Sequence, residues 1–288
     1  MSDRVFRKED VCVIIPAYNE GLVIGSVVLE ARQFSETVIV IDDGSSDKTA
    51  EIARLAGAEV IVMEKNSGKA HAMLVGFARA QELDKAATVM LDGDGQHNPG
   101  EIPLVAAPVL AGEADLVVGS RFLAAESEEE IPTYRKFGQK VLNEATNVSS
   151  GVKCSDSQSG YRALSLKALA NMDFVTSGYG IESDMLAHFS EIGLRITEVP
   201  ISVTYEVPHK HKMNPVKHGL SVLSGILQLF TFKRPLVCFG VPGLVFICVG
   251  VYLAVLAFDI VARSGTWATN TTLGASMLLM MGMLLVSV

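Results

Sequence analysis

Five apolar runs alternate with helical segments over the first 120 residues, and this alternation restricts the fold more than any other feature. The runs cover residues 11–17, 37–42, 58–64, 87–92 and 114–120. A run such as VCVIIPA is apolar throughout, as expected of a strand that is covered on both faces. Closely repeated β-α units predict an α/β domain whose mostly parallel, Rossmann-like sheet carries helices on both faces.

Polar residues follow each of the predicted strands. The segments after the first four are PAYNE, DDGSSD, NSGK and DGDGQ, and Ser120-Arg121 follows the fifth. One DGSSD or DGDG alone would more often be a turn and helix cap. Ligands of parallel sheets bind at the carboxyl ends of the strands. Five such ends therefore predict a binding site built from acids, glycines and a few cations.

The apolar fraction of 49% is high for a purely soluble protein, and it points to a membrane part. Residues 236–258 carry no charge and reach roughly 35 Å as a helix, which is enough to cross a bilayer core. The uncharged stretch 265–288 is strongly apolar only from residue 273, roughly 24 Å, so we expect its threonine-rich start to contribute to the span. The alternative for both is a pair of buried core helices.

The positive residues predict the orientation of this hairpin. By the positive-inside rule, residues 1–234 lie in the cytoplasm and the protein is a two-span protein of the cell membrane. The net charge of −8 argues against a nucleic-acid partner. Five cations precede the first span and one lies between the spans: Lys210, Lys212, Lys217, Lys233 and Arg234, then Arg263.

The motifs VIIPAYNE, VIVIDDGSSDKT, NSGKAHAM, MLDGDGQHNP and DLVVGSRF together resemble the family 2 glycosyltransferases of the GT-A fold. DSQSGYRAL and the C-terminal hairpin are similar to the branch that includes dolichol-phosphate mannose synthase. The resemblance covers about residues 10–207 by motif. It implies an inverting transfer of a hexose from a UDP- or GDP-hexose to a polyprenyl or dolichyl phosphate. It specifies neither the sugar, the lipid length nor the oligomeric state.

The resemblance suggests three parts. Residues 1–207 form the catalytic domain, residues 208–234 a basic loop and an amphipathic helix, and residues 235–288 two transmembrane helices. The apolar residues of 215–230 share one helix face, so this helix is expected to lie in the membrane interface. The alternative is a helix that packs on the catalytic domain.

Two aspartates that straddle Gly93 predict a metal site. Asp92 and Asp94 can turn toward one ion, and oxygen ligands suit Mg²⁺ or Mn²⁺, with diphosphate oxygens and water completing the shell. In the resembled family the second acid of this motif binds the metal. By this resemblance Asp94 is the ligand, Asp92 faces the nucleotide or the metal, and Gln96 lies in the same shell. Gly93 is grouped with the nucleotide contacts.

The nucleotide is expected over the first two loops. Pro16, Tyr18 and Glu20 resemble the family's contacts to base and ribose. Asp42 is expected to accept a hydrogen bond from the base or ribose. Its neighbour Asp43 is favoured as a cap of its own turn, although the sequence does not separate the two firmly.

Three cations are candidates for binding phosphates. Gly68 allows close approach of the backbone, and Lys69 is placed for a phosphate or base, unless it is only a solvated helix start. Arg121 and Arg135 have the forked geometry that matches phosphate, and they could hold both the donor and an anionic acceptor. The alternative for both arginines is a surface role.

The acceptor decides whether the reaction needs a base. A hydroxyl must be deprotonated, whereas a lipid phosphate is already ionised. Candidate acids are Asp156, Glu182 and Asp184. The last two resemble the acid motif of hydroxyl-accepting relatives, but the Arg-Trp element that usually follows is absent, which favours the phosphate.

Two rival hypotheses remain. One is a hydroxyl acceptor with Asp184 or Glu182 as base, and the other is a non-catalytic membrane subunit that binds nucleotide-sugar. The acceptor end of the site is expected to be shaped by Ser159, Gly160 and Arg162.

Overall fold

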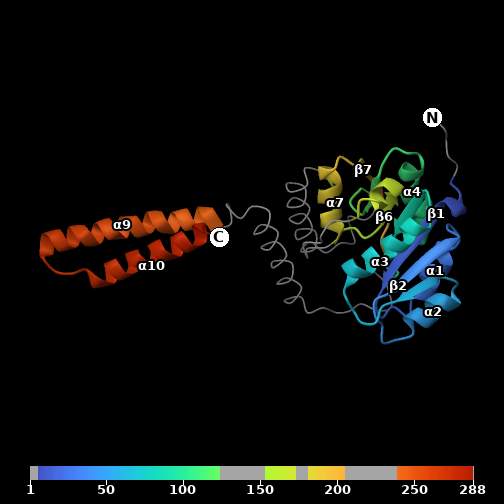
Figure 1. Cartoon of the computed structure of the whole chain (residues 1–288), viewed down its shortest axis with the longest axis horizontal. Coiled ribbons are helices and arrows are strands. Elements are labelled where there is room, and N and C mark those ends of the chain that lie inside the picture. Colours follow the sequence, from blue (N-terminus) through green and yellow to red (C-terminus); the bar gives the residue numbers. More distant parts are fainter. Residues whose placement is uncertain (1–5, 124–152, 173–180, 205–238, 288) are drawn as a thin grey trace. The chain divides into compact units, whose positions relative to one another are not determined.

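The computed structural model describes residues 6–123, 153–172, 181–204 and 239–287 (Figure 1). By its internal contacts the chain divides into two units, Met1–Pro215 and Val216–Val288. The predicted boundary at residue 207 and the predicted interface helix 215–230 fall outside the described residues, so both stay predictions.

The first unit is built on a seven-stranded sheet with the order β3-β2-β1-β4-β6-β5-β7. Six strands run in one direction, and β6 runs antiparallel to them between β4 and β5. The prediction of a mostly parallel sheet is therefore confirmed, while β6 and β7 were not predicted. The strands are β1 Val11–Ala17, β2 Thr37–Asp42, β3 Glu59–Val62, β4 Ala87–Met90, β5 Leu116–Ser120, β6 Arg162–Ser165 and β7 Ile196–Pro200.

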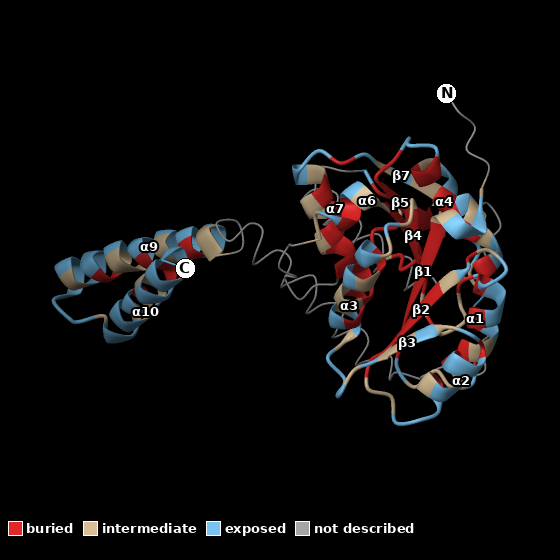
Figure 2. Cartoon of the chain, turned by 45° about the vertical axis from the view of Figure 1, so that its right-hand side comes forward, coloured by how far each residue is buried: buried red, intermediate tan, exposed pale blue. Residues whose placement is uncertain are grey.

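Helices cover both faces of the sheet, as the apolar strands require. Strand β1 shows the reason, because Val13 and Ile15 belong to one buried cluster whereas Cys12 and Ile14 belong to the other. Figure 2 shows these strands as the buried centre of the unit. One cluster includes residues of α1 Ile24–Ala31, α2 Thr49–Leu55 and α4 Ile102–Leu110; the other includes residues of α3 Lys69–Glu82, α6 Leu166–Leu169 and α7 Ile181–Glu191. Short 3-10 turns occur at η1 Lys8–Asp10 and η2 Pro99–Glu101.

This packing fixes the carboxyl ends of β1, β2 and β4 next to one another. A fully buried aliphatic side chain contributes about 1.5–3 kcal/mol to folding relative to an exposed one. Ile14 is 1% exposed and Ile41 is fully buried, so these strands are held firmly just before their polar ends begin.

The second unit contains two long apolar helices, α9 Val241–Ser264 and α10 Thr269–Val286. By length and composition both could cross a membrane. The first extends beyond the predicted end of its span, and Asp259 and Arg263 form an ion pair on its last turns. Glycines let the helices approach closely, since a Cβ on Gly282 would lie 2.7 Å from the carbonyl oxygen of Gly243.

Candidate active site

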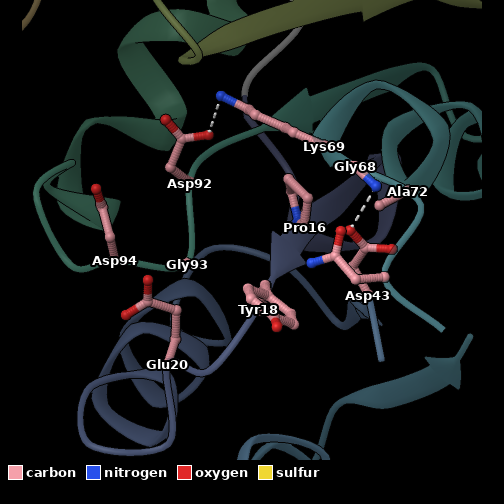
Figure 3. A pocket seen from close by; sticks show the side chains of 12 residues that line it. Pro16, Tyr18, Glu20, Asp43, Gly68, Lys69, Ala72, Asp92, Gly93 and Asp94 are labelled. Carbon is pink, nitrogen blue, oxygen red and sulfur yellow. Dashed lines mark hydrogen bonds and ion pairs between the residues drawn. The ribbon is translucent and has the colours of Figure 1, made fainter. Parts of the chain in front are cut away.

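A pocket of about 360 Å³ lies where the predicted polar loops converge. The predicted nucleotide and metal residues all line it except Asp42 and Gln96 (Figure 3). Ala17, Asn66 and Ala72 line it as well, although the sequence did not single them out. The complete lining is Pro16, Ala17, Tyr18, Glu20, Asp43, Asn66, Gly68, Lys69, Ala72, Asp92, Gly93 and Asp94.

The two aspartates at the carboxyl end of β2 have different hydrogen-bond partners. Asp42 accepts a hydrogen bond from the backbone N–H of Ser45 at 3.1 Å, so Asp42 closes the turn. Asp43 instead accepts from the N–H groups of Ser67 at 2.8 Å and Gly68 at 2.9 Å. The expectation that Asp43 caps its own turn is therefore wrong. Asp43 faces the pocket and clamps the loop that leads into α3.

This clamp sets the position of Lys69, the first residue of α3. Its Nζ lies 2.6 Å from Oδ1 of Asp92 and 2.9 Å from Oε1 of Glu182. Burial opposes the charge, but the two carboxylates raise the pKa of Lys69 above its ordinary value. Burial alone would raise the pKa of Asp92, but Lys69, together with other nearby charges, holds the pKa of that carboxyl below its usual range. Lys69 is thus more than a solvated helix start.

Two further residues hold Asp92 in place. Nδ1 of His97 accepts a hydrogen bond from the backbone N–H of Asp92 at 3.2 Å, and the ring packs against Tyr161. Burial lowers the pKa of His97, which favours the neutral ring that this acceptor role requires. A Cβ at Gly160 would lie 2.6 Å from Oδ2 of Asp92, so the motif needs glycine there. His97 was not predicted, although it closes the DGDGQH segment.

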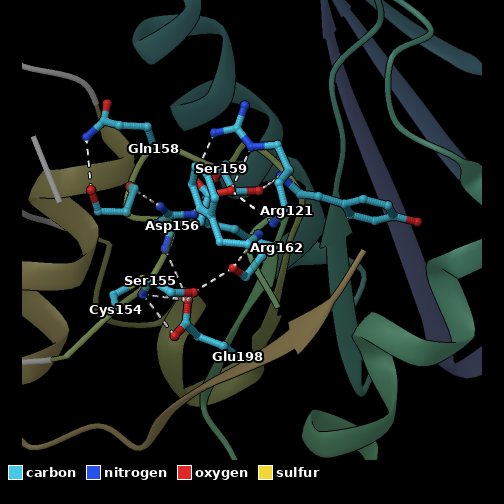
Figure 4. Close-up of polar contacts among 12 residues, drawn as sticks. Arg121, Cys154, Ser155, Asp156, Gln158, Ser159, Arg162 and Glu198 are labelled. Atoms are coloured by element: carbon cyan, nitrogen blue, oxygen red, sulfur yellow. Dashed lines mark hydrogen bonds and ion pairs between the residues drawn. The ribbon is translucent and has the colours of Figure 1, made fainter. Parts of the chain in front are cut away.

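Arg121 and Asp156 form a second acid–cation pair (Figure 4). Nε of Arg121 lies 2.7 Å from Oδ2 of Asp156, and a guanidinium NH2 group lies 2.7 Å from Oδ1. Such a two-pronged pair fixes both the position and the orientation of the arginine. Asp156 is 1% exposed. Its carboxylate is therefore committed to Arg121, which also contributes to lowering the pKa of Asp92. Arg135 lies outside the described residues.

Glu198 of β7 supports this pair, and it was not predicted from the sequence. Its Oε1 accepts from the backbone N–H of Ser155 at 2.9 Å, from the Ser155 hydroxyl at 2.8 Å and from the N–H of Asp156 at 3.3 Å. These bonds hold the loop that presents Asp156 to Arg121. An acid in a strand such as ITEVP has no local signature, because its partners lie about 40 residues away in the chain.

Arg162 joins the predicted acceptor segment to α7. Its side chain is fully buried and donates to the backbone carbonyls of Ser157 at 2.8 Å, Ser159 at 2.9 Å and Glu182 at 2.7 Å. Ser159, Gly160 and Arg162, which were expected to shape the acceptor end, thus lie in one segment that contacts both Asp92 and the first turn of α7.

Comparison with known proteins gives the family. The sequence profile of Glycosyl transferase family 2 matches residues 12–172. The chain belongs to glycosyltransferase family 2. The predicted family, GT-A fold and enzymatic class are therefore confirmed, and the alternative of a non-catalytic subunit is not supported.

Two relatives and one solved structure place this glycosyltransferase more closely. It is 31% identical to a UDP-N-acetylglucosamine--dolichyl-phosphate N-acetylglucosaminyltransferase of Methanococcus voltae, over 75% of this chain and 94% of the relative. It is 34% identical to a polyprenol monophosphomannose synthase of Mycolicibacterium smegmatis, over 67% and 76%. Glucosyl-3-phosphoglycerate synthase of Mycobacterium tuberculosis, solved with Mn²⁺ and UDP, superimposes with a TM-score of 0.60 at 25% identity, covering 77% and 79%.

The acids of the pocket are suited to a divalent cation. Burial raises the pKa of Asp94, and burial together with repulsion from Asp94 raises the pKa of Glu20 to about 7. This surplus of negative charge would be relieved by a cation. Within the described residues no group of three or more His, Cys, Asp or Glu side chains could hold a metal unaided. An ion here would therefore need oxygens from a bound diphosphate and water.

We predict that Glu20 makes the stability of the metal-free protein depend on pH. Its pKa rises from 4.5 to about 7 on folding, so the folded state binds the extra proton between these values. Stability should fall as the pH rises through about 7. Thermal melts in EDTA should show equal Tm values for wild type and Glu20→Gln near pH 4, and a higher Tm for Glu20→Gln at pH 8.

The exposed Glu36 provides the control, because Glu36→Gln makes the same change outside the pocket. A difference between Glu20→Gln and wild type that stays constant from pH 4 to pH 8 would contradict the raised pKa.

Proposed function

We propose that this enzyme is anchored in the cell membrane and transfers a hexose, with inversion, from a nucleotide-sugar to a polyprenyl or dolichyl phosphate. The proposal rests on one observation: two of the acids that could act as a base are each paired with a cation. Asp156 is held by Arg121, and Glu182 by Lys69. Acids that are bound to cations suit an acceptor that is already ionised. The acceptors named for the relatives, dolichyl phosphate among them, support the same choice.

The donor is proposed to be a UDP- or GDP-hexose in the pocket. Tyr18 and Glu20, beside Pro16, would face the base and ribose, and Asp43 would take the part first assigned to Asp42, because Asp43 is the one that lines the pocket. UDP in the solved structural neighbour supports a nucleoside diphosphate of this class. Lys69 is then placed for the diphosphate.

A Mg²⁺ or Mn²⁺ ion is proposed beside the diphosphate, held by Asp94 with Asp92 and Gln96 near it. When bound, the ion would stabilise the negative charge that develops on the leaving group. Oδ1 of Asp94 accepts from the backbone N–H of Gln96 at 3.0 Å, which orients this carboxylate.

The proposed reaction is a single displacement. A phosphate oxygen of the acceptor forms a bond to the anomeric carbon while the bond from that carbon to the diphosphate oxygen breaks. No proton has to be removed, so the protein has to orient two anions and balance their charge. Arg121 is proposed for this work from its fixed position, and Arg135 from its place in the sequence.

A hydroxyl acceptor remains the second candidate. Asp184 lies two residues after Glu182 on α7 and is only half-buried, so it is the better-placed base of the two. This candidate predicts that an amide at Asp184 abolishes turnover.

We predict that the enzyme discriminates between a polyprenyl phosphate and the unphosphorylated polyprenol of equal length. Purified protein given radiolabelled UDP- and GDP-hexoses should transfer sugar to the phosphate alone. Asp184→Asn should retain substantial turnover, whereas Arg135→Ala should lose at least about 100-fold, or about 3 kcal/mol of transition-state stabilisation. Comparable transfer to polyprenol, together with an inactive Asp184→Asn, would favour the hydroxyl acceptor.

We also predict that turnover requires a divalent cation at Asp94. Excess EDTA should abolish turnover, and Asp94→Asn should reduce it at least about 100-fold without changing the Tm by more than a few degrees. Glu113→Gln, an exposed acid outside the pocket, should behave like wild type. Full turnover in excess EDTA would exclude the metal site.

The orientation gives a further prediction. If the cations before α9 face the cytoplasm, protease added to sealed, right-side-out cells should leave residues 1–230 uncut, and permeabilised cells should show cleavage. Cleavage of that region in sealed cells would reverse the proposed topology.

A further inference from the structure

Three charged groups from three elements meet at the edge of the pocket. Asp92 follows β4, Lys69 begins α3, and Glu182 lies in the first turn of α7. The ammonium group of Lys69 is within 3 Å of both carboxylates, at 2.6 Å from Asp92 and 2.9 Å from Glu182. Figure 3 shows Lys69 reaching across the pocket edge to Asp92. Lys69 therefore connects the DGDG loop with a helix that is about 90 residues further along the chain.

Glu182 is a fixed point in this arrangement. The residue is 7% exposed, and its backbone carbonyl accepts a 2.7 Å hydrogen bond from the fully buried Arg162. Its neighbour Ser183 accepts a hydrogen bond from the side-chain amide of Gln158. The first turn of α7 is thus tied to the segment that carries Gly160 against Asp92.

Lys69 is the part of the arrangement that a ligand could use. Among the described residues that line the pocket it is the only cation, whereas Glu20, Asp43, Asp92 and Asp94 all carry carboxyl groups. Its side chain is 42% exposed and lines the pocket, so a ligand in the pocket can approach it. An entering diphosphate would meet Lys69 as the positive lining group.

We infer that Glu182 is a positioning residue of the donor site. Glu182 holds the Lys69 ammonium group beside Asp92, where the ammonium group can receive the diphosphate of the nucleotide. The inference rests on the proposed nucleotide-sugar donor. A lysine stem is flexible, so an ammonium group with one anchor samples more positions than one held between two. Removing the charge of Glu182 therefore weakens nucleotide binding even when no acceptor is present.

This role is separable from that of a general base. A base acts on the acceptor, and its loss lowers kcat while the affinity for a nucleoside diphosphate stays unchanged. A positioning residue that acts through Lys69 changes donor binding, and its effect disappears once Lys69 is gone.

The test is calorimetric titration of UDP and GDP into the full-length protein in detergent, with Mn²⁺ and without acceptor. We expect Glu182→Gln to bind nucleotide about tenfold more weakly than wild type, in the range of one hydrogen bond to a charged group. Glu191→Gln makes the same change at the exposed end of the same helix and should bind like wild type. Glu182→Asp keeps the charge on a shorter side chain, farther from Lys69, and should give an intermediate affinity.

The double variant gives the sharper result. Lys69→Met should weaken binding at least as much as Glu182→Gln, and Lys69→Met combined with Glu182→Gln should bind no more weakly than Lys69→Met alone. In turnover assays Glu182→Gln should raise the donor KM more than it lowers kcat, and the pH profile of kcat should not change.

Two outcomes would overturn the inference. If wild type, Glu182→Gln and Glu191→Gln bind nucleotide equally while Glu182→Gln loses kcat, Glu182 acts on the acceptor and the donor pocket stands. If wild type binds neither nucleotide, the proposed donor fails and this inference fails with it.

Discussion

The structure depends on keeping four carboxyl groups together at the edge where β1, β2 and β4 end. Glu20, Asp43, Asp92 and Asp94 line one pocket, and burial together with repulsion from Asp94 raises the pKa of Glu20. Each unmatched charge in such a site costs free energy of folding. Lys69 matches Asp92, and two backbone N–H groups match Asp43. Asp94 and Glu20 keep the unbalanced charge, which is the part of the pocket that a cation would complete.

The two acid–cation pairs, Asp156 with Arg121 and Glu182 with Lys69, are themselves held in place by residues that do not line the pocket. Glu198 fixes the loop that presents Asp156 to Arg121, and Arg162 fixes the turn of α7 that presents Glu182 to Lys69. In both cases an ionised side chain is satisfied mainly by backbone groups, so it adds no competing ion to the pocket. A polar layer of this kind keeps the cations oriented, which is what the proposed binding of two anionic substrates would require.

The sequence predicted most of the fold because its strands are short, apolar and each followed by a polar loop. It could not predict β6, since an antiparallel strand inserted between β4 and β5 arises from a distant segment, Arg162–Ser165, with only four residues. It also favoured Asp43 as the cap of its own turn, whereas Asp42 makes that hydrogen bond. Adjacent acids in DDGSSD have the same local turn chemistry, and the partners of Asp43 lie in the loop before α3. His97 and Glu198 act through distant or backbone partners that no motif marks.

Family membership alone does not identify the acceptor, but the two acid–cation pairs bear on its chemistry. A carboxylate beside a sugar-transfer pocket can remove a proton only when no cation occupies it. In this chain two of the candidate bases, Glu182 and Asp156, are each bound to a cation at less than 3 Å. Under the proposed function, the same contacts would make these acids supports for a cation instead of bases, and Lys69 and Arg121 would balance the negative charge of the substrates. An acceptor that arrives already ionised needs supports of this kind.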